Sequence, residues 1–181
     1  MVLLEGVGDF EIGQEMPEFN LKNIDGKFVS DKDLSKDFKM IAFTCNHCPY
    51  AQAAWPKLTE IYSKFKDKMD IVAINPNDAK KYPADSYEKM IEFAKDNSIE
   101  FPYLHDETQE IARKFGAKCT PDIFIFKDNK LVHRGRIDDN WEKDYNETNH
   151  ELEEALGDIM DKGKVEAKVC PSSGCSIKWK D

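Results

Sequence analysis

Apolar residues in this 181-residue chain follow two spacings, one typical of buried strands and one typical of amphipathic helices. Short apolar runs at 40–43, 71–74 and 123–126 have the length of strands that are buried on both faces. In the stretches 54–65 and 87–94, apolar residues recur every three or four positions, which predicts helices with one buried face. The order strand, helix, strand over the first two runs predicts a parallel pair.

Two hairpins extend this pattern. The short alternating segments 19–21 and 27–29 flank the turn sequence 23–26, which ends in glycine. The apolar runs 123–126 and 131–135 are separated by four polar residues, as in an antiparallel pair. We therefore expect an α/β fold whose central mixed sheet is flanked by helices.

Polar residues mark the ends of two further helices. Asp85 with Glu88 has the spacing of a capping box, which predicts that a helix begins there. Thr148 with Glu151 has the same spacing, and Gly163 is well suited to end the helix that follows. The last helix is therefore predicted to run from 148 to 163.

The chain is expected to form one domain, residues 1–163, and a C-terminal tail, residues 164–181, that packs on the same domain. A chain of this length buries enough surface to build a substantial core. The tail contains Pro, Ser, Ser and Gly at 171–174, a composition that predicts irregular structure.

Charge and composition restrict the function. The net charge is −9, with 35 acidic and 26 basic residues, which argues against nucleic acid or an anionic membrane as the main partner. No apolar run approaches the roughly 20 residues that a membrane span needs, and the N-terminus lacks the pattern of a secretory signal. We expect a cytoplasmic protein, in which five cysteines are too few for a disulfide scaffold.

Cys45 and Cys48 carry the candidate chemistry. They lie where the run 40–43 ends and a helical pattern begins. The first turn of a helix has unpaired N–H groups and the positive end of the helix dipole, which favour thiolate over thiol. The pattern predicts a reactive dithiol in which Cys45, expected to be the more exposed, attacks a substrate disulfide and Cys48 resolves the mixed disulfide.

The Cys-x-x-Cys pair, the parallel strands, Thr120-Pro121 before a hairpin and the closing helix together resemble a thioredoxin-like fold. The N-terminal hairpin, an inserted helix and strand between 85 and 104, and the tail are similar to its peroxiredoxin-like branch, which is related to alkyl hydroperoxide reductase and thiol-specific antioxidant proteins. Four sequence motifs match one group of this branch, at 43–50, 101–109, 119–122 and 174–179.

This resemblance implies that the Thr120-Pro121 bond is cis and lies against the cysteine pair. The backbone of Thr120 would then pair with an incoming peptide or thiol. The resemblance also implies thiol–disulfide oxidoreductase activity without a bound cofactor. Its partners would be a disulfide-containing protein or a small thiol, and a reductant such as a thioredoxin system or glutathione. The working direction, reduction or oxidation, stays open.

Two other functions remain as alternatives. In a metal-binding module, Cys45 and Cys48 would need two more ligands, from Cys119, Cys170, Cys175 or a histidine. In a thiol peroxidase, Cys48 would match the peroxide-reducing cysteine of the peroxiredoxin motif Pro-x-x-x-Thr/Ser-x-x-Cys.

The peroxidase motif is not met. It needs Thr or Ser at position 45 and Pro at position 41, and this chain has Cys45 and Ile41. Arg134 or Arg136 could supply an arginine that steadies a peroxide, although arginines on a strand face are commonly just solvated.

The neighbouring residues have open roles. His47, between the cysteines, either stabilises a nearby thiolate or faces solvent with little effect. Cys119 is either a relay thiol close to the pair or a small buried residue. Cys170 and Cys175 flank a turn that would let them bond to each other, and a tail disulfide of this kind could exchange with Cys45.

Overall fold

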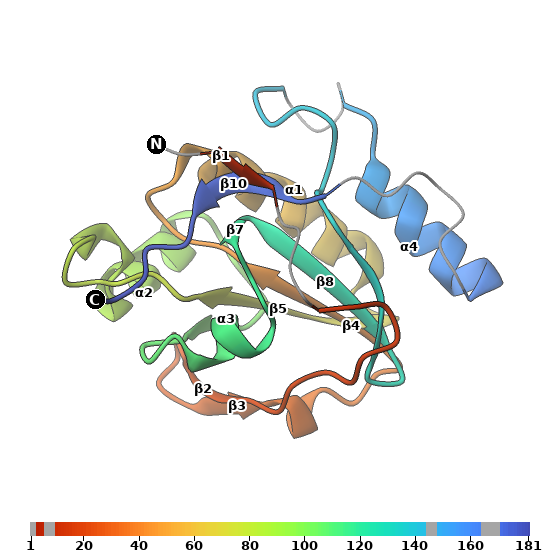
Figure 1. Ribbon diagram of the computed structural model, residues 1–181, viewed down its shortest axis with the longest axis horizontal. Coiled ribbons are helices and arrows are strands. Elements are labelled where there is room, and N and C mark those ends of the chain that lie inside the picture. The colour runs from red at the N-terminus through yellow and green to blue at the C-terminus, as the bar shows by residue number, and fades with distance from the viewer. Residues whose placement is uncertain (1–2, 6–9, 144–147, 164–170) are drawn as a thin grey trace.

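The computed structural model describes residues 3–5, 10–143, 148–163 and 171–181, and the side chains from residue 10 onward within these ranges. A seven-stranded mixed sheet in the order β3-β2-β6-β5-β4-β8-β9 forms its centre (Figure 1). β4 pairs in parallel with β5 and antiparallel with β8, and β5 pairs in parallel with β6. The strands are β2 (Asn20–Asn23), β3 (Phe28–Ser30), β4 (Phe38–Phe43), β5 (Met69–Asn75), β6 (Tyr103–His105), β8 (Asp122–Lys127) and β9 (Lys130–Gly135). The expected mixed sheet and both expected hairpins are therefore confirmed.

Helices cover both faces of this sheet. The helices are α1 (Pro49–Phe65), α2 (Tyr87–Asp96), α3 (Glu110–Lys114) and α4 (Glu151–Lys162). Successive residues of β4 point to opposite faces, so that Met40 packs in a cluster with α1, α2 and α4, whereas Ile41 packs in a second cluster with α3. β4 is thus buried on both sides, as its uninterrupted apolar run predicts.

A second, smaller sheet holds the C-terminal tail. It has the order β1-β10-β7, and its strands are β1 (Leu3–Glu5), β7 (Cys119–Thr120) and β10 (Ser173–Ser176). Figure 1 shows β10, in dark blue, lying beside β1 and over the start of α1. The expectation of an irregular tail is wrong for 173–176, because these residues find unpaired strand edges at β7 and β1 that the local sequence does not reveal.

Two predicted helix starts are also corrected. α2 is capped by Ser86, whose side chain accepts a hydrogen bond from the Lys89 backbone, and Asp85 belongs to the preceding 3-10 turn instead. α4 begins at Glu151 rather than at Thr148, and it ends at Gly163 as predicted, with φ +76°. A capping-box spacing fixes only which side chains could cap, and tertiary partners decide which of them do.

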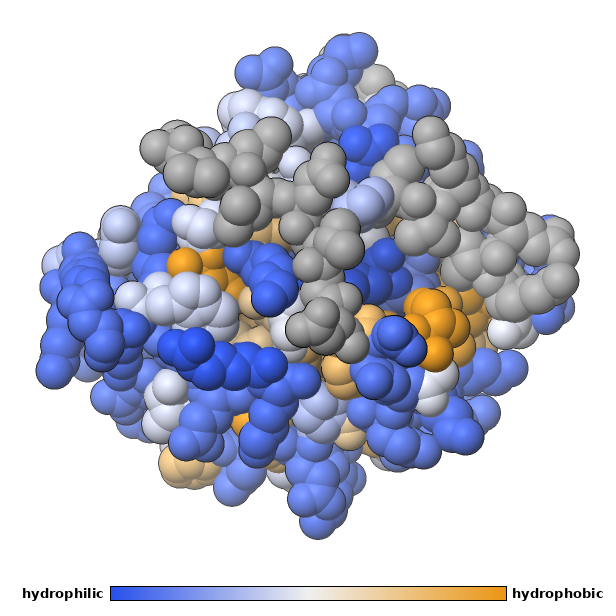
Figure 2. Space-filling view, viewed as in Figure 1, coloured by the Kyte–Doolittle hydropathy of each residue, from blue (hydrophilic) through white to orange (hydrophobic). Residues whose placement is uncertain are grey.

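The surface agrees with the strongly charged composition. Hydrophilic side chains cover most of the described part of the face in Figure 2, and hydrophobic ones form only small areas. Among the described residues, no helix is both long enough and apolar enough to cross a bilayer.

Candidate active site

The loop 44–48 carries the first two cysteines from the centre of the sheet to α1. β4 ends at Phe43, and the Thr44 backbone N–H then donates to the Ile74 carbonyl on β5 at 2.9 Å. Cys48 is the N-cap residue of α1, and Pro49 fills the first helical position, where a missing N–H costs nothing. The predicted placement of the pair at the start of a helix is confirmed.

Cys48 is bonded to Cys175. Their Cα atoms lie 6.5 Å apart, although 127 positions separate them in the chain. The expectation that Cys175 bonds to Cys170 is therefore wrong. Cys170 itself lies outside the described residues. Sequence spacing suggested a local bridge, but pairing of β10 with β7 brings Cys175 to the start of α1.

Cys45 is a free thiol and fully buried. Its Sγ lies 3.4 Å from the Thr120 hydroxyl oxygen, and its carbonyl accepts a hydrogen bond from Trp55 Nε1 at 3.0 Å. The prediction that Cys45 is the more exposed of the pair is wrong, since Cys45 and Cys48 are 0% and 1% exposed. Burial, followed by the negative charge of Asp85, raises the pKa of Cys45 to about 12.

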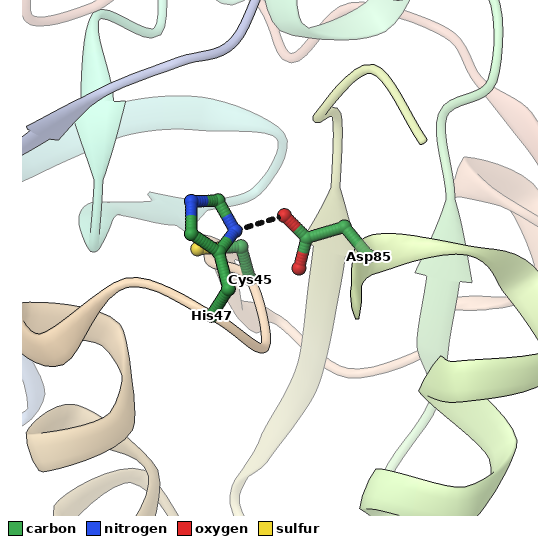
Figure 3. A group of neighbouring side chains, drawn as sticks. All are labelled: Cys45, His47 and Asp85. Carbon is green, nitrogen blue, oxygen red and sulfur yellow. Dashed lines mark hydrogen bonds and ion pairs between the residues drawn. The ribbon is translucent and has the colours of Figure 1, made fainter. Parts of the chain in front are cut away.

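His47 is held by Asp85 and by an aromatic ring. Its Nδ1 lies 2.5 Å from Asp85 Oδ2, an interaction drawn as a dashed line in Figure 3, and its ring stacks on Tyr82 with 5.0 Å between centroids. The side chain is 25% exposed, so it is neither free in solvent nor fully buried. Of the two roles considered for His47, this arrangement argues against a side chain that simply faces solvent, and stabilisation of a nearby thiolate stays a prediction.

Asp85 holds the cysteine loop in place through hydrogen bonds. Besides His47, its carboxylate accepts hydrogen bonds from the Asn46 backbone at 2.7 Å and from Asn77 Nδ2 at 2.8 Å. Burial by itself would raise the pKa of Asp85, but the hydrogen bonds from His47, Asn77 and Asn46 outweigh it and lower this pKa. Asp85 is therefore a buried carboxylate that the sequence pattern assigned to a helix cap.

Asn46 and Tyr103 complete this polar layer. The Tyr103 hydroxyl donates to Asn46 Oδ1 at 2.8 Å, and the Asn46 side-chain amide donates to the Ala84 carbonyl at 2.9 Å. Both residues are buried, so the loop between the cysteines has little freedom to shift. Asn46 could be suspected only from its place between the two cysteines, and no local pattern indicates the inward hydroxyl of Tyr103.

Thr120 and Pro121 lie against the cysteine cluster. The Thr120-Pro121 peptide bond is cis, as the resemblance implied. The Thr120 hydroxyl contacts Cys45, and its carbonyl oxygen lies 3.7 Å from Cys48 Sγ. The position opposite Thr120 in the small sheet is taken by Cys175.

Cys119 is separate from the cluster of Cys45, Cys48 and Cys175. It is fully buried, its Sγ lies 3.5 Å from the Pro121 carbonyl oxygen, and burial raises its pKa. This environment favours the small buried residue over the relay thiol.

Cys45, His47 and Asp85 are also residues of metal-ligating types that lie close together, with one donor atom of each within 4.8 Å of the others. Two ligands of a tetrahedral zinc ion lie about 3.3 Å apart, given Zn–N and Zn–O bonds of about 2.0–2.1 Å. The His47 and Asp85 atoms, at 2.5 Å, are hydrogen-bonded to each other instead. Cys48, the other expected ligand, is used by its bond to Cys175.

The two candidate arginines are both engaged with carboxylates. Arg134 Nη2 lies 2.6 Å from Asp122 Oδ2 and also donates to the Gly116 carbonyl. Arg136 Nε lies 2.6 Å from Glu151 Oε2 on α4. Neither arrangement resembles a guanidinium presented to a cysteine.

Comparisons with known proteins place this site in a family. The structure of an uncharacterized conserved protein from Geobacillus kaustophilus matches with a TM-score of 0.91 and 38% identity, over 99% of this chain and 97% of that chain. A hypothetical protein from Sinorhizobium meliloti 1021 matches with a TM-score of 0.87 and 30% identity, over 95% and 96% of the two chains.

A relative whose name states an activity is the thiol-disulfide oxidoreductase ResA of Bacillus thuringiensis subsp. konkukian. It is 28% identical over 125 residues, which are 67% of this chain and 68% of its own. The model of the AhpC/TSA family matches residues 12–134, a range that contains Cys45, Cys48, the cis proline and the main sheet except the last residue of β9. Because this match spans more than half of the chain and includes the elements that hold the site, the protein belongs to the AhpC/TSA family and has the thioredoxin-like fold.

Proposed function

We propose that this protein catalyses thiol–disulfide exchange, with Cys45 as the nucleophile and Cys48 as the resolving thiol. The observation that carries the proposal is the buried cluster of Cys45, Cys48 and Cys175, in which one thiol lies beside one disulfide. The names of the relatives support the same chemistry.

The three sulfurs allow a balanced sequence of exchanges. In the reduced protein, the Cys45 thiolate attacks a substrate disulfide, forms a mixed disulfide and releases one substrate thiolate. Cys48 then attacks Cys45 Sγ, which releases the second substrate thiolate and leaves a Cys45–Cys48 disulfide. Attack of Cys175 on Cys48 Sγ gives the bond seen in the structure and returns Cys45 to the thiol form. Each step exchanges one S–S bond for another.

While Cys48 is bonded to Cys175, as in the structure, Cys45 is inactive. With a pKa of about 12, roughly one Cys45 in 10⁵ is a thiolate at pH 7. A thiol is a poor nucleophile, so Cys45 must first become accessible to solvent before it can react with a substrate. Reduction of the Cys48–Cys175 bond is the step that would permit this.

The proposal implies two kinds of partner, a disulfide-containing protein or small molecule as substrate and a thiol reductant such as a thioredoxin system or glutathione. Such a reductant is available in the cytoplasm, which we propose as the compartment. His47 would act by its fixed position beside the loop, and Thr120, held by its cis bond to Pro121, by its contacts with the sulfurs of Cys45 and Cys48.

A redox titration with disulfide mapping by mass spectrometry tests this function. On oxidation, wild type should form the Cys48–Cys175 disulfide. The variant Cys175→Ser should form a Cys45–Cys48 disulfide instead. Cys45→Ser should lose reduction of a small aromatic disulfide, whereas Cys119→Ser, the matched buried-thiol control, should keep it. If no linkage that involves Cys45 forms at any potential, Cys45 is not the nucleophile.

A further inference from the structure

The tail strand β10 occupies a strand edge beside the cysteines. β10 is antiparallel to β7, with Cys175 opposite Thr120 and Ser176 opposite Cys119. In the described part of the chain, β10 is the only strand that pairs with β7. Without β10, this edge would present unpaired backbone N–H and C=O groups, the kind of edge to which extended peptides add.

Gly174 lies against this edge with no space for a side chain. A Cβ at this position would be 2.2 Å from the Thr120 carbonyl oxygen and 2.7 Å from its carbonyl carbon. Because backbone atoms next to the cis proline cannot move aside easily, alanine does not fit without displacing the strand. The residue before the cysteine in this segment must therefore be glycine.

The segment is also fixed on either side of Gly174 and Cys175. Three positions before the cysteine, the buried Ser172 hydroxyl donates to the Gly135 carbonyl at 2.7 Å. Two positions after it, Ile177 is 3% exposed in the apolar cluster around α3, and its backbone N–H donates to the Lys118 carbonyl at 3.2 Å. The site therefore contacts an extended segment on both sides of the cysteine, and not its thiol alone.

We propose that residues 172–177 occupy the substrate site as a tethered mimic of the substrate. The site then binds extended protein segments with glycine directly before the cysteine and an apolar residue two positions after it. This inference rests on the proposed function and names the substrate class of the oxidised protein, in which the disulfide open to attack is Cys48–Cys175 and Cys45 is a free thiol. The chain's own tail is the resident occupant, so an incoming segment binds only by displacing it.

The displacement is a single exchange at Cys48. The thiolate of the incoming segment attacks Cys48 Sγ, a new S–S bond forms to the segment, and Cys175 leaves as a thiolate. No net electrons are consumed, since one disulfide replaces another. Because the tail is tethered and acts at high effective concentration, a free peptide must be in excess to compete.

A matched pair of peptides tests the proposal on the oxidised full-length chain. One peptide has the sequence of residues 171–179, and the other differs only by alanine in place of the glycine that corresponds to Gly174. We expect at least tenfold more mixed disulfide with the glycine peptide, and peptide mapping should locate it on Cys48. The same pair applied to Gly174→Ala, whose own tail fits less well, should give more adduct with the glycine peptide than wild type gives.

Equal yields with the two peptides, or attachment to a cysteine other than Cys48, would overturn the peptide site. Glutathione, applied in parallel, separates this result from failure of the proposed function. If glutathione opens the Cys48–Cys175 bond but the peptides do not differ, only the substrate class is wrong. If neither glutathione nor a peptide opens this bond, thiol–disulfide exchange itself is contradicted. The wild-type comparison needs no substitution, so it stands even if Gly174→Ala folds poorly.

Discussion

His47 and Asp85 are 38 positions apart in the chain, yet His47 Nδ1 lies 2.5 Å from Asp85 Oδ2 beside the cysteine loop. The same carboxylate accepts the Asn46 N–H, so one buried anion fixes two of the residues between Cys45 and Cys48. Its charge also opposes ionisation of Cys45. Asp85 therefore links the shape of the loop to the reactivity of its first thiol.

Replacement of Asp85 by Asn should lower the pKa of Cys45, because the neighbouring negative charge that disfavours the thiolate is gone. In oxidised protein, where Cys45 is a free thiol and Cys48 is bonded, the ultraviolet absorbance of the Cys45 thiolate, measured as the difference from the matching Cys45→Ser protein, should appear at lower pH in Asp85→Asn. Asp106→Asn is the control, since Asp106 is a buried carboxylate that contributes no charge effect at Cys45. An unchanged pH dependence of this absorbance in Asp85→Asn would contradict the prediction.

Removal of the tail disulfide should weaken the oxidised protein. The Cys48–Cys175 bond closes a loop of 127 positions, and loss of a native disulfide typically costs about 2–5 kcal/mol. Urea unfolding of Cys175→Ser should show a loss of this size without reductant and a much smaller difference from wild type with reductant. Cys170→Ser leaves the bond in place and serves as the control. Equal stability of wild type and Cys175→Ser under oxidising conditions would contradict the prediction.

His133 on β9 should make stability depend on pH. The ring is 4% exposed, and neither of its nitrogens has a hydrogen-bond partner among the described residues. Burial lowers the pKa of His133 to about 4, so between the ordinary value of about 6.5 and about 4 the unfolded chain binds a proton that the folded chain excludes. Stability should therefore fall as the pH drops through this range, by up to about 3 kcal/mol.

The contribution of His133 is isolated by His133→Leu, which cannot bind the proton and should flatten the free energy of unfolding between pH 6.5 and pH 4. His150→Gln is the matched control, because the His150 ring is 30% exposed and lies beside Glu153. If His133→Leu keeps the full pH slope of wild type, the slope arises from other groups.

Hydroperoxide should be a poor substrate. Position 45 lacks the Thr or Ser and position 41 the Pro of the peroxidase motif, and the guanidinium groups of Arg134 and Arg136 are paired with carboxylates. We expect peroxide consumption in the presence of dithiothreitol to match that of Cys48→Ser. The same preparation should reduce a small aromatic disulfide, which shows that its thiols are active. Fast peroxide consumption that is lost in Cys48→Ser would support the peroxidase instead.

Much of the main sheet could be predicted because its signals are local. The run 40–43 has no polar residue to place at a surface, and the turn residues 127–130 separate two apolar runs, so β4 and the β8–β9 hairpin follow from patterning alone. The Cys-x-x-Cys pair and Thr120-Pro121 indicated the fold through their resemblance to a known family. Asp85 shows where local reasoning fails, since its spacing to Glu88 predicted a cap but its buried partners at 46, 47 and 77 lie elsewhere in the chain.

The sequence by itself determined that Cys45 and Cys48 stand where a buried strand meets a helix, because hydrophobic periodicity and helix-start residues act over a few positions. Tertiary structure alone decided the partner of each sulfur. Cys175 reaches Cys48 through the pairing of β10 with β7, and the pKa of Cys45 is raised by burial and then by the charge of Asp85. Contacts across 127 positions depend on which strand edges remain open and which groups share a buried volume, and no local pattern encodes them.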